Sequence, residues 1–169
     1  MQLQTKKMVE ITEFAPQYQT AIEQLVLPIQ QVEFGVAVTR EEQPDLIDIQ
    51  GVFKKGNGNF WLALHDGEVV GCVGVADIGN AQVALKKMFV QREFRGKQFG
   101  VGAALLDTAK QWCRQHGVQS IYLGTTAQMA AAHRFYEKNG FVEVEVPQLP
   151  PDFPIVHVDS KFYRCDLEG

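Results

Sequence analysis

The chain has 169 residues, of which 46% are hydrophobic and 21% are charged, and its formal net charge is −4. These values predict a single globular domain over residues 1–169 and exclude a disordered chain. The acidic balance, without any block of basic residues, argues against nucleic acid as a partner. No apolar run reaches transmembrane length and no signal-peptide core begins the chain, so we expect a cytoplasmic protein without a membrane partner.

The cysteines and histidines predict no metal centre. Cys72, Cys113 and Cys165 are odd in number and lie in apolar segments, which is typical of buried free thiols in a reducing compartment. The four histidines show no metal-ligand spacing with these cysteines. We therefore expect neither a disulfide nor a structural metal.

The N-terminal half shows two helical patterns followed by three strand patterns. Asp66-Gly67 is a strong hairpin signal between two of these strands, and Gly79-Asn80 marks the next turn. The expected elements are a strand at 9–14, a helix from Pro16 to about Ile29, a loop at 30–43, a helix from Pro44 to 53, and strands at 60–64, 69–76 and 83–90.

The C-terminal half alternates helices and strands. Gly117 can cap the first of its helices, and Thr126 can begin the second. The expected elements are a helix at 101–116, a strand at 121–123, a helix at 126–138, a strand at 141–146, a proline-rich loop, and a strand at 161–167. The whole order predicts a mixed α/β (α+β) domain.

The segment RGKQFGVG at residues 95–102 is the strongest functional signal. It joins a strand pattern to a helix pattern, and a glycine-rich turn that opens a helix directs free N–H groups and the positive end of the helix dipole at one point. Such a turn suits a phosphate or pyrophosphate. A Walker loop is excluded because Gln98 follows Gly96-Lys97, and a dinucleotide fingerprint is excluded because the next strand ends in Thr125-Thr126 without a carboxylate.

Two blocks at this loop and about forty residues beyond it resemble the GCN5-related N-acetyltransferase (GNAT) family. The first runs from Met88 through the loop, and the second is AHRFYEKNGF at residues 132–141. The resemblance implies a GNAT-like fold with a mixed, mostly antiparallel sheet, and acetyl-CoA as cofactor with CoA as product. It assigns cofactor binding to Met88, Phe89, Val90, Arg95, Gly96, Lys97, Gln98, Phe99, Gly100, Val101 and Gly102.

The chain departs from the family pattern at two positions. Gln98 replaces the middle glycine of the loop, and Met129 stands where the family often has a cofactor-contacting asparagine. These departures keep open the alternative of a non-catalytic acyl-CoA-binding regulatory domain.

The resemblance also implies catalytic roles. Tyr136 matches the tyrosine that protonates the departing CoA thiolate, and a phenol is protonated at neutral pH. Backbone N–H groups near Met88 or Phe89, on a strand that is bulged in the family, would bind the thioester carbonyl.

The general base is less defined by sequence. Our first candidate is Glu33, in the inter-helix loop that shapes the acceptor pocket in the family, with Asp77 and Asp159 as alternatives. His133 could relay a proton one helical turn before the tyrosine. Strand alternation places Lys86 and Lys87 on opposite faces, so at most one should line the cleft.

The sequence therefore predicts an enzyme, an acetyl-CoA-dependent N-acetyltransferase that moves an acetyl group directly to the primary amine of a small molecule. A peptide or protein N-terminus, or a lysine, remains open as the acceptor. Homodimers are common in the resembled family, so a homodimer is a further expectation.

Overall fold

The computed structural model describes residues 9–96 and 98–167, so Lys97 of the expected phosphate loop lies outside the described residues. These residues contain one seven-stranded sheet with the order β1-β2-β3-β4-β5-β7-β6. The strands are β1 (Glu10–Glu13), β2 (Asn59–His65), β3 (Glu68–Gly79), β4 (Gln82–Val90), β5 (Ser120–Thr125), β6 (Val142–Val144) and β7 (Lys161–Asp166). Neighbouring strands of this sheet are antiparallel except β4 and β5, which confirms the mixed, mostly antiparallel sheet.

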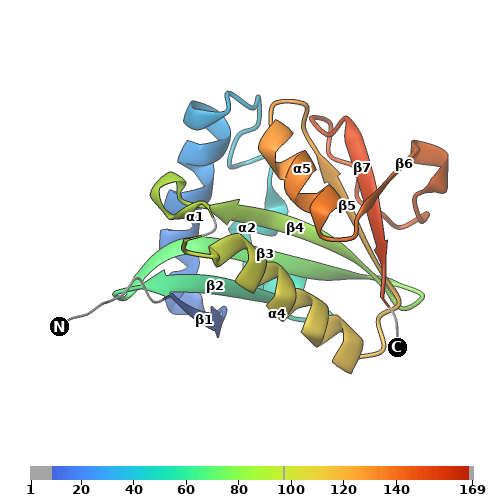
Figure 1. Cartoon of the computed structure of the whole chain (residues 1–169), viewed down its shortest axis with the longest axis horizontal. Coiled ribbons are helices and arrows are strands. Elements are labelled where there is room, and N and C mark those ends of the chain that lie inside the picture. The colour runs from blue at the N-terminus through green and yellow to red at the C-terminus, as the bar shows by residue number, and fades with distance from the viewer. Residues whose placement is uncertain (1–8, 97, 168–169) are drawn as a thin grey trace.

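Helices cover both faces of the sheet (Figure 1). The helices are α1 (Gln19–Pro28), α2 (Pro44–Ile47), α3 (Ile49–Phe53), α4 (Val101–Gln115) and α5 (Ala130–Lys138). Alternation along β2 separates the two layers: Phe60 and Leu62 pack with α1 and α3, whereas Trp61 and Ala63 pack with α4. The pattern expected from sequence thus builds a core on each side of the sheet.

Strands β4 and β5 pair only at their first residues. The parallel register covers Gln82 to Ala84 opposite Ser120 to Tyr122, although β4 continues to Val90 and β5 to Thr125. The two strands then diverge, as Figure 1 shows. The second half of β4 therefore has backbone groups without a strand partner on its β5 side.

A β-bulge lies in the diverging half of β4. Cys72 pairs with Phe89 and Gly74 with Lys86, so two residues of β4 oppose Val73 alone. Lys87 occupies the bulge with φ +58°, a left-handed conformation that costs a non-glycine residue about 1–2 kcal/mol. The buried Cys72 thiol donates a hydrogen bond to the Lys87 carbonyl at 3.1 Å, which supports this conformation.

Several element boundaries differ from the sequence prediction. Helix α5 begins at Ala130 rather than at Thr126, because residues 126–129 form a backbone turn closed by a hydrogen bond from Met129 N–H to the Thr126 carbonyl. The 44–53 helix is two short helices, with a break at Asp48. The first helix continues after Pro28 as a π-helical turn, Ile29–Glu33, where a loop was expected.

The cysteine prediction is confirmed: Cys72, Cys113 and Cys165 are buried and free. Within residues 9–96 and 98–167, no helix combines the length and apolar character needed to span a bilayer. Within the same residues, no three metal-binding side chains cluster.

Candidate active site

Two cavities meet at the point where β4 and β5 diverge. One has a volume of about 390 Å³ and extends from the end of β4 to the loop before α4. The other has a volume of about 130 Å³ and lies between β4, the 30–45 segment and the 153–159 loop. Met88, Phe89, Met129 and Tyr136 line both cavities. A group bound in either cavity can therefore contact a group bound in the other beside these four residues.

The larger cavity has the features expected of a site for the pyrophosphate and pantetheine arm of an acyl-CoA. Gly100 is the N-cap residue of α4 and has φ +62°, and the first N–H groups of this 15-residue helix have no intrahelical acceptor. The Gly100 N–H itself donates to the Gly96 carbonyl at 3.2 Å, so the free donors belong to the residues that follow it. The rest of the cavity is largely apolar, with Ala132 and Phe135 of α5 facing the end of β4.

The expected cofactor residues divide into two groups in the structure. The larger cavity is lined by Met88, Phe89, Val90, Arg95, Gly96, Gly100 and Gly102. Val101 is instead buried in the core beneath α4, and Phe99 packs against Phe94 with ring centroids 5.0 Å apart. Gln98 is exposed. None of these three residues lines the cavity.

Arg95 and Glu33 form an ion pair outside the smaller cavity. The Arg95 guanidinium donates to both Glu33 carboxylate oxygens, at 2.5 and 2.8 Å, and its Nε donates to the Val90 carbonyl at 2.8 Å. The hydrogen bonds from Arg95 hold the pKa of Glu33 below its usual range. Glu33 lies in a surface groove with Gln91 and Arg92, so the structure does not place it where the expected base would meet an acceptor amine.

Tyr136 lies in the wall between the two cavities. Its side chain is buried against Phe135, Phe141 and Tyr163, with ring centroids 5.6–6.1 Å apart. Burial raises the pKa of its phenol, which stays protonated at neutral pH. Within the described residues its hydroxyl has no hydrogen-bond partner, which leaves it free to donate to a bound group.

Lys86 and Lys87 both line the smaller cavity, so the prediction that at most one would do so is wrong. The bulge at Lys87 interrupts the strand alternation and turns both ammonium groups toward Asp45 of α2. The Lys86 and Lys87 Nζ atoms lie 2.5 and 3.1 Å from Asp45 Oδ2. All three side chains are largely buried, with exposed fractions of 17%, 9% and 10% for Lys86, Lys87 and Asp45.

The two ammonium groups also determine the protonation of this cluster. Burial alone would raise the pKa of Asp45, but the charges of Lys87 and Lys86 outweigh it and hold that pKa below its usual range. Burial lowers the pKa of Lys87, and the Asp45 carboxylate opposes this effect.

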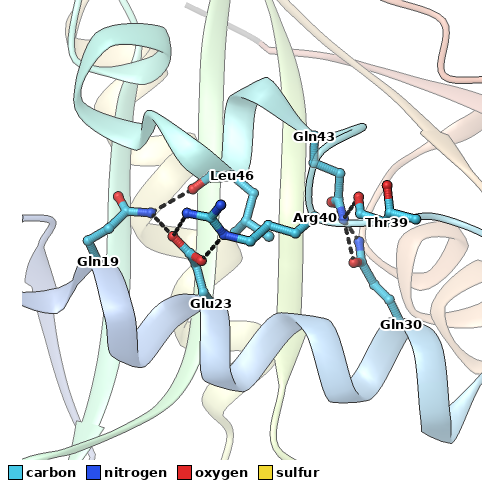
Figure 2. Close-up of polar contacts among 7 residues, drawn as sticks. All are labelled: Gln19, Glu23, Gln30, Thr39, Arg40, Gln43 and Leu46. Atoms are coloured by element: carbon cyan, nitrogen blue, oxygen red, sulfur yellow. Dashed lines mark hydrogen bonds and ion pairs between the residues drawn. The ribbon is translucent and has the colours of Figure 1, made fainter.

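The segment that carries Asp45 is fixed to α1 and to the π-helical turn after it by polar contacts (Figure 2). Buried Gln30 and Gln43 exchange hydrogen bonds of 2.9 and 3.0 Å through their side-chain amides. Arg40 donates to Glu23 of α1, and Gln19 reaches the Leu46 carbonyl at 2.7 Å. These contacts are made by residues directly before and after Asp45 in the chain, and they fix this wall of the smaller cavity.

Asp159 is the expected carboxylate that the structure brings to the smaller cavity. It lies above Gly124 of β5, where an added Cβ would come within 2.5 Å of its Oδ2 atom. Burial raises the pKa of Asp159, although a backbone hydrogen bond at Val156 and the charges of Lys86, Lys87 and His157 oppose the shift.

The other expected proton carriers lie elsewhere. Asp77 accepts hydrogen bonds from the Asn57 and Gly79 N–H groups and fixes a turn. His133 contacts the Thr126 carbonyl through Nε2 at 2.9 Å and lines neither cavity, so its placement indicates a role in holding the turn before α5.

Sequence reasoning missed two residues of the smaller cavity. Asp45 follows Pro44 at a helix start, where an acidic residue is ordinary, and only the fold brings it to β4. Thr126 was expected as a helix cap, but its side-chain oxygen is buried without a hydrogen-bond partner among the described residues and it lines the cavity.

Comparison with known proteins agrees with this geometry. Residues 23–141 match the model of the acetyltransferase (GNAT) family, which covers most of the chain. The chain belongs to this family. It therefore contains a domain of the acetyltransferase family, whose members use acetyl-CoA as acyl donor, and the free amides at α4 and the apolar cavity beside β4 fit that donor.

Several GNAT relatives are similar over much of the chain. A GNAT acetyltransferase structure from Staphylococcus aureus Mu50 is 35% identical with a TM-score of 0.91, covering 95% of this chain and 99% of that one. "N-acetylaspartate synthetase" of Rattus norvegicus is 39% identical over 99 residues, which are 57% of this chain and 32% of the relative. "Probable N-acetyltransferase camello" of Xenopus tropicalis is 32% identical over 144 residues, 81% of this chain and 64% of the relative. The chain thus spans between 32% and 64% of the length of these two curated relatives.

Proposed function

We propose that this protein transfers an acetyl group directly from acetyl-CoA to the primary amine of a small molecule. The observation that carries the proposal is the meeting of a 390 Å³ cavity and a 130 Å³ cavity beside Tyr136, Met88, Phe89 and Met129. The larger cavity suits the donor, and the smaller one suits the acceptor.

The residues around the point where the two cavities meet have different roles in this reaction. Acetyl-CoA, when bound, supplies the activated thioester. The free N–H groups at the start of α4 bind its pyrophosphate, and N–H groups of β4 near Met88 or Phe89 bind the thioester carbonyl. The Tyr136 hydroxyl donates a proton to the leaving thiolate.

Asp159 is our choice for the group that takes the proton from the acceptor amine. An alkyl ammonium with a pKa near 10.4 requires roughly 4–5 kcal/mol to deprotonate at neutral pH, so a carboxylate with a raised pKa assists more than an ordinary one. Asp159 has such a pKa and lines the acceptor cavity. Glu33 is paired with Arg95 and lies outside it.

The size of the acceptor cavity favours a small molecule over a peptide or protein. Its volume of about 130 Å³ lies below the roughly 300–1,000 Å³ of sites for drug-sized ligands. The relative named N-acetylaspartate synthetase also supports a metabolite acceptor. Tyr136, positioned with a free hydroxyl, supports a catalytic protein over a regulatory acyl-CoA-binding domain.

Initial-rate kinetics tests the direct transfer. Varying acetyl-CoA and an amine together should give intersecting double-reciprocal lines, because both substrates must occupy the joined cavities before reaction. Parallel lines would indicate an acetyl-enzyme and contradict direct transfer.

A glycine substitution tests the phosphate turn. Gly100→Val places a β-branched residue at φ +62°, where open space surrounds the added Cβ, so the loss is one of backbone conformation rather than packing. We expect acetyl-CoA affinity, measured by calorimetry, to fall by at least about tenfold, since charge-assisted hydrogen bonds contribute roughly 1.5–3 kcal/mol each.

Gly117→Val is the matched control for this variant. Gly117 has φ +73° and equally open surroundings, but it lies at the other end of α4. It should lose comparable stability while keeping acetyl-CoA affinity. Equal affinities of the two variants would contradict a phosphate site at the Gly100 turn.

A second glycine substitution tests the placement of Asp159. Gly124→Ala puts a Cβ within 2.5 Å of the Asp159 carboxylate and must displace it. We expect turnover to fall about tenfold or more while acetyl-CoA affinity is kept, because the larger cavity does not include Gly124. Unchanged turnover in a folded variant would argue against Asp159 as the base.

Two sequence-based predictions remain for solution work. We expect the protein in the cytoplasm and in a homodimer. A sedimentation mass near the 18.9 kDa of one chain at working concentration would exclude the dimer.

A further inference from the structure

The acceptor cavity has a positive region and a negative region. Lys86 and Lys87 share the single carboxylate of Asp45, so these three residues carry one excess positive charge when both lysines are protonated. Asp159 lines the same cavity, close enough to both lysines for their charges to lower its pKa. Glu42 also lines the cavity, but its carboxylate is exposed and accepts a hydrogen bond from the Thr39 N–H at 2.9 Å.

An excess positive charge in this buried position destabilises the folded protein. Each buried ion loses several kcal/mol of hydration, and an ion cluster regains this only when opposite charges balance it. The bulge at Lys87 adds backbone strain in order to turn both ammonium groups to one side. One lysine would be enough to pair with Asp45 and fix α2 to β4, so the second amino group is available to an anion that comes with the substrate.

A polar side chain without a hydrogen-bond partner in the same cavity also indicates a charged or polar ligand. The Thr126 side-chain oxygen is buried without a hydrogen-bond partner among the described residues, and Thr126 is 6% exposed. Buried hydroxyls without partners are rare, because the lost hydration is not replaced. A ligand with a carboxylate or an ammonium group would satisfy it.

From these observations we infer that the acceptor is a small amino acid, whose carboxylate binds Lys86 and Lys87 while its amine faces Asp159. The inference rests on the proposed function and narrows its substrate class. Lys86 and Lys87 directly precede Met88 and Phe89, and strand residues are about 3.3 Å apart, so the amine and the carboxylate must lie close together in the molecule. The cavity of about 130 Å³ agrees with a molecule of this size.

The experiment compares amino acids with their own carboxamides as acceptors. Glycine, β-alanine and aspartate are each paired with the amide that lacks the negative charge, and CoA release and the acetylated product are both measured. The amine of the carboxamide has the lower pKa, so a larger fraction of it is neutral and reactive at a given pH. A higher kcat/KM for the acid would therefore appear despite its less reactive amine. We expect kcat/KM for at least one acid to exceed that of its amide by about 100-fold, the discrimination that charged hydrogen bonds provide.

Substitution of Lys86 tests whether the lysine cluster causes the preference for an amino acid over its carboxamide. Lys86→Met should raise KM for the preferred amino acid by about tenfold or more and leave its carboxamide within about threefold. Lys86→Arg, which keeps the charge, should recover most of the loss. Lys54→Met is the control, because Lys54 pairs with Glu13 and does not line the cavity.

Each contrary outcome has a separate meaning. If the amides react as well as the acids, or if Lys86→Met affects both equally, the transferase stands and the amino-acid inference is overturned. If other small amines are acetylated but none of these acids is, only the amino-acid inference is overturned. If acetyl-CoA binds but no acid, amide or other small amine is acetylated, the proposed function fails and the inference fails with it.

Discussion

Tyr136→Phe should lower kcat by about 10²- to 10⁴-fold, the usual contribution of a positioned general acid. The substitution removes one hydroxyl and keeps the ring, which packs against Phe135, Phe141 and Tyr163. Because that hydroxyl has no hydrogen-bond partner within the described residues, its loss leaves no protein group unpaired. Acetyl-CoA affinity and thermal stability should therefore stay near those of the wild type.

The matched control is Tyr163→Phe. Tyr163 is a neighbouring buried tyrosine whose hydroxyl donates to Glu137 at 2.7 Å, so its loss should affect stability more than turnover. Stopped-flow detection of CoA release under single-turnover conditions separates chemistry from product release. A Tyr136→Phe protein with the wild-type single-turnover rate would remove Tyr136 from the mechanism.

Asp159→Asn should lower turnover by about 10²-fold or more and remove the acidic limb of the pH–rate profile. Asp159 accepts a proton only when ionised, and burial raises its pKa. In the wild type, kcat/KM for the amine should fall as the pH drops through that raised value. Profiles measured over roughly pH 5 to 8 for both proteins test the assignment.

The same substitution should affect stability in the opposite direction. Because folding raises the pKa of Asp159, the folded state holds this proton more tightly than the unfolded state, and its contribution to stability is lost as the pH rises. Asp159→Asn should therefore raise the melting temperature at neutral pH relative to the wild type, and less so in acid. A gain in stability with a loss of activity is typical of a substitution that removes a functional group whose burial destabilises the folded protein.

Two other carboxylates serve as comparisons. Asp77→Asn weakens a turn and should lower stability without changing the shape of the pH profile. If Glu33→Gln, rather than Asp159→Asn, removed the acidic limb, the base would be Glu33 and the assignment to Asp159 would be wrong.

The fold was largely predictable because its signals are local. Asp66-Gly67 marked the β2–β3 hairpin, and the β-branched and aromatic residues of the 83–90 run predicted β4. The glycine-rich turn at residues 95–102 predicted the start of α4, where the structure gives Gly100 a φ of +62°. The family resemblance then predicted where the donor cavity lies, because contacts to an acyl-CoA depend on backbone groups in the two matched blocks.

The acceptor cavity was less predictable because it depends on contacts between distant segments. The bulge that turns Lys87 is stabilised by Cys72 and Asp45, neither of which stands near it in sequence. Thr126 has the side chain of a good helix cap, but a backbone turn starts the helix four residues later. Glu33 was expected in the acceptor pocket, and the π-helical turn places it against Arg95 instead.

Mass analysis of the reaction products distinguishes an acetyltransferase from a domain that only binds acetyl-CoA. The purified protein is incubated with acetyl-CoA, with and without a panel of small amines that includes aspartate, and CoA and acetylated amine are quantified in each sample. We expect CoA to be released only when an amine is present, with one acetylated amine formed for each CoA. Binding of acetyl-CoA without any acetylated amine would contradict it and would favour a regulatory acyl-CoA-binding domain.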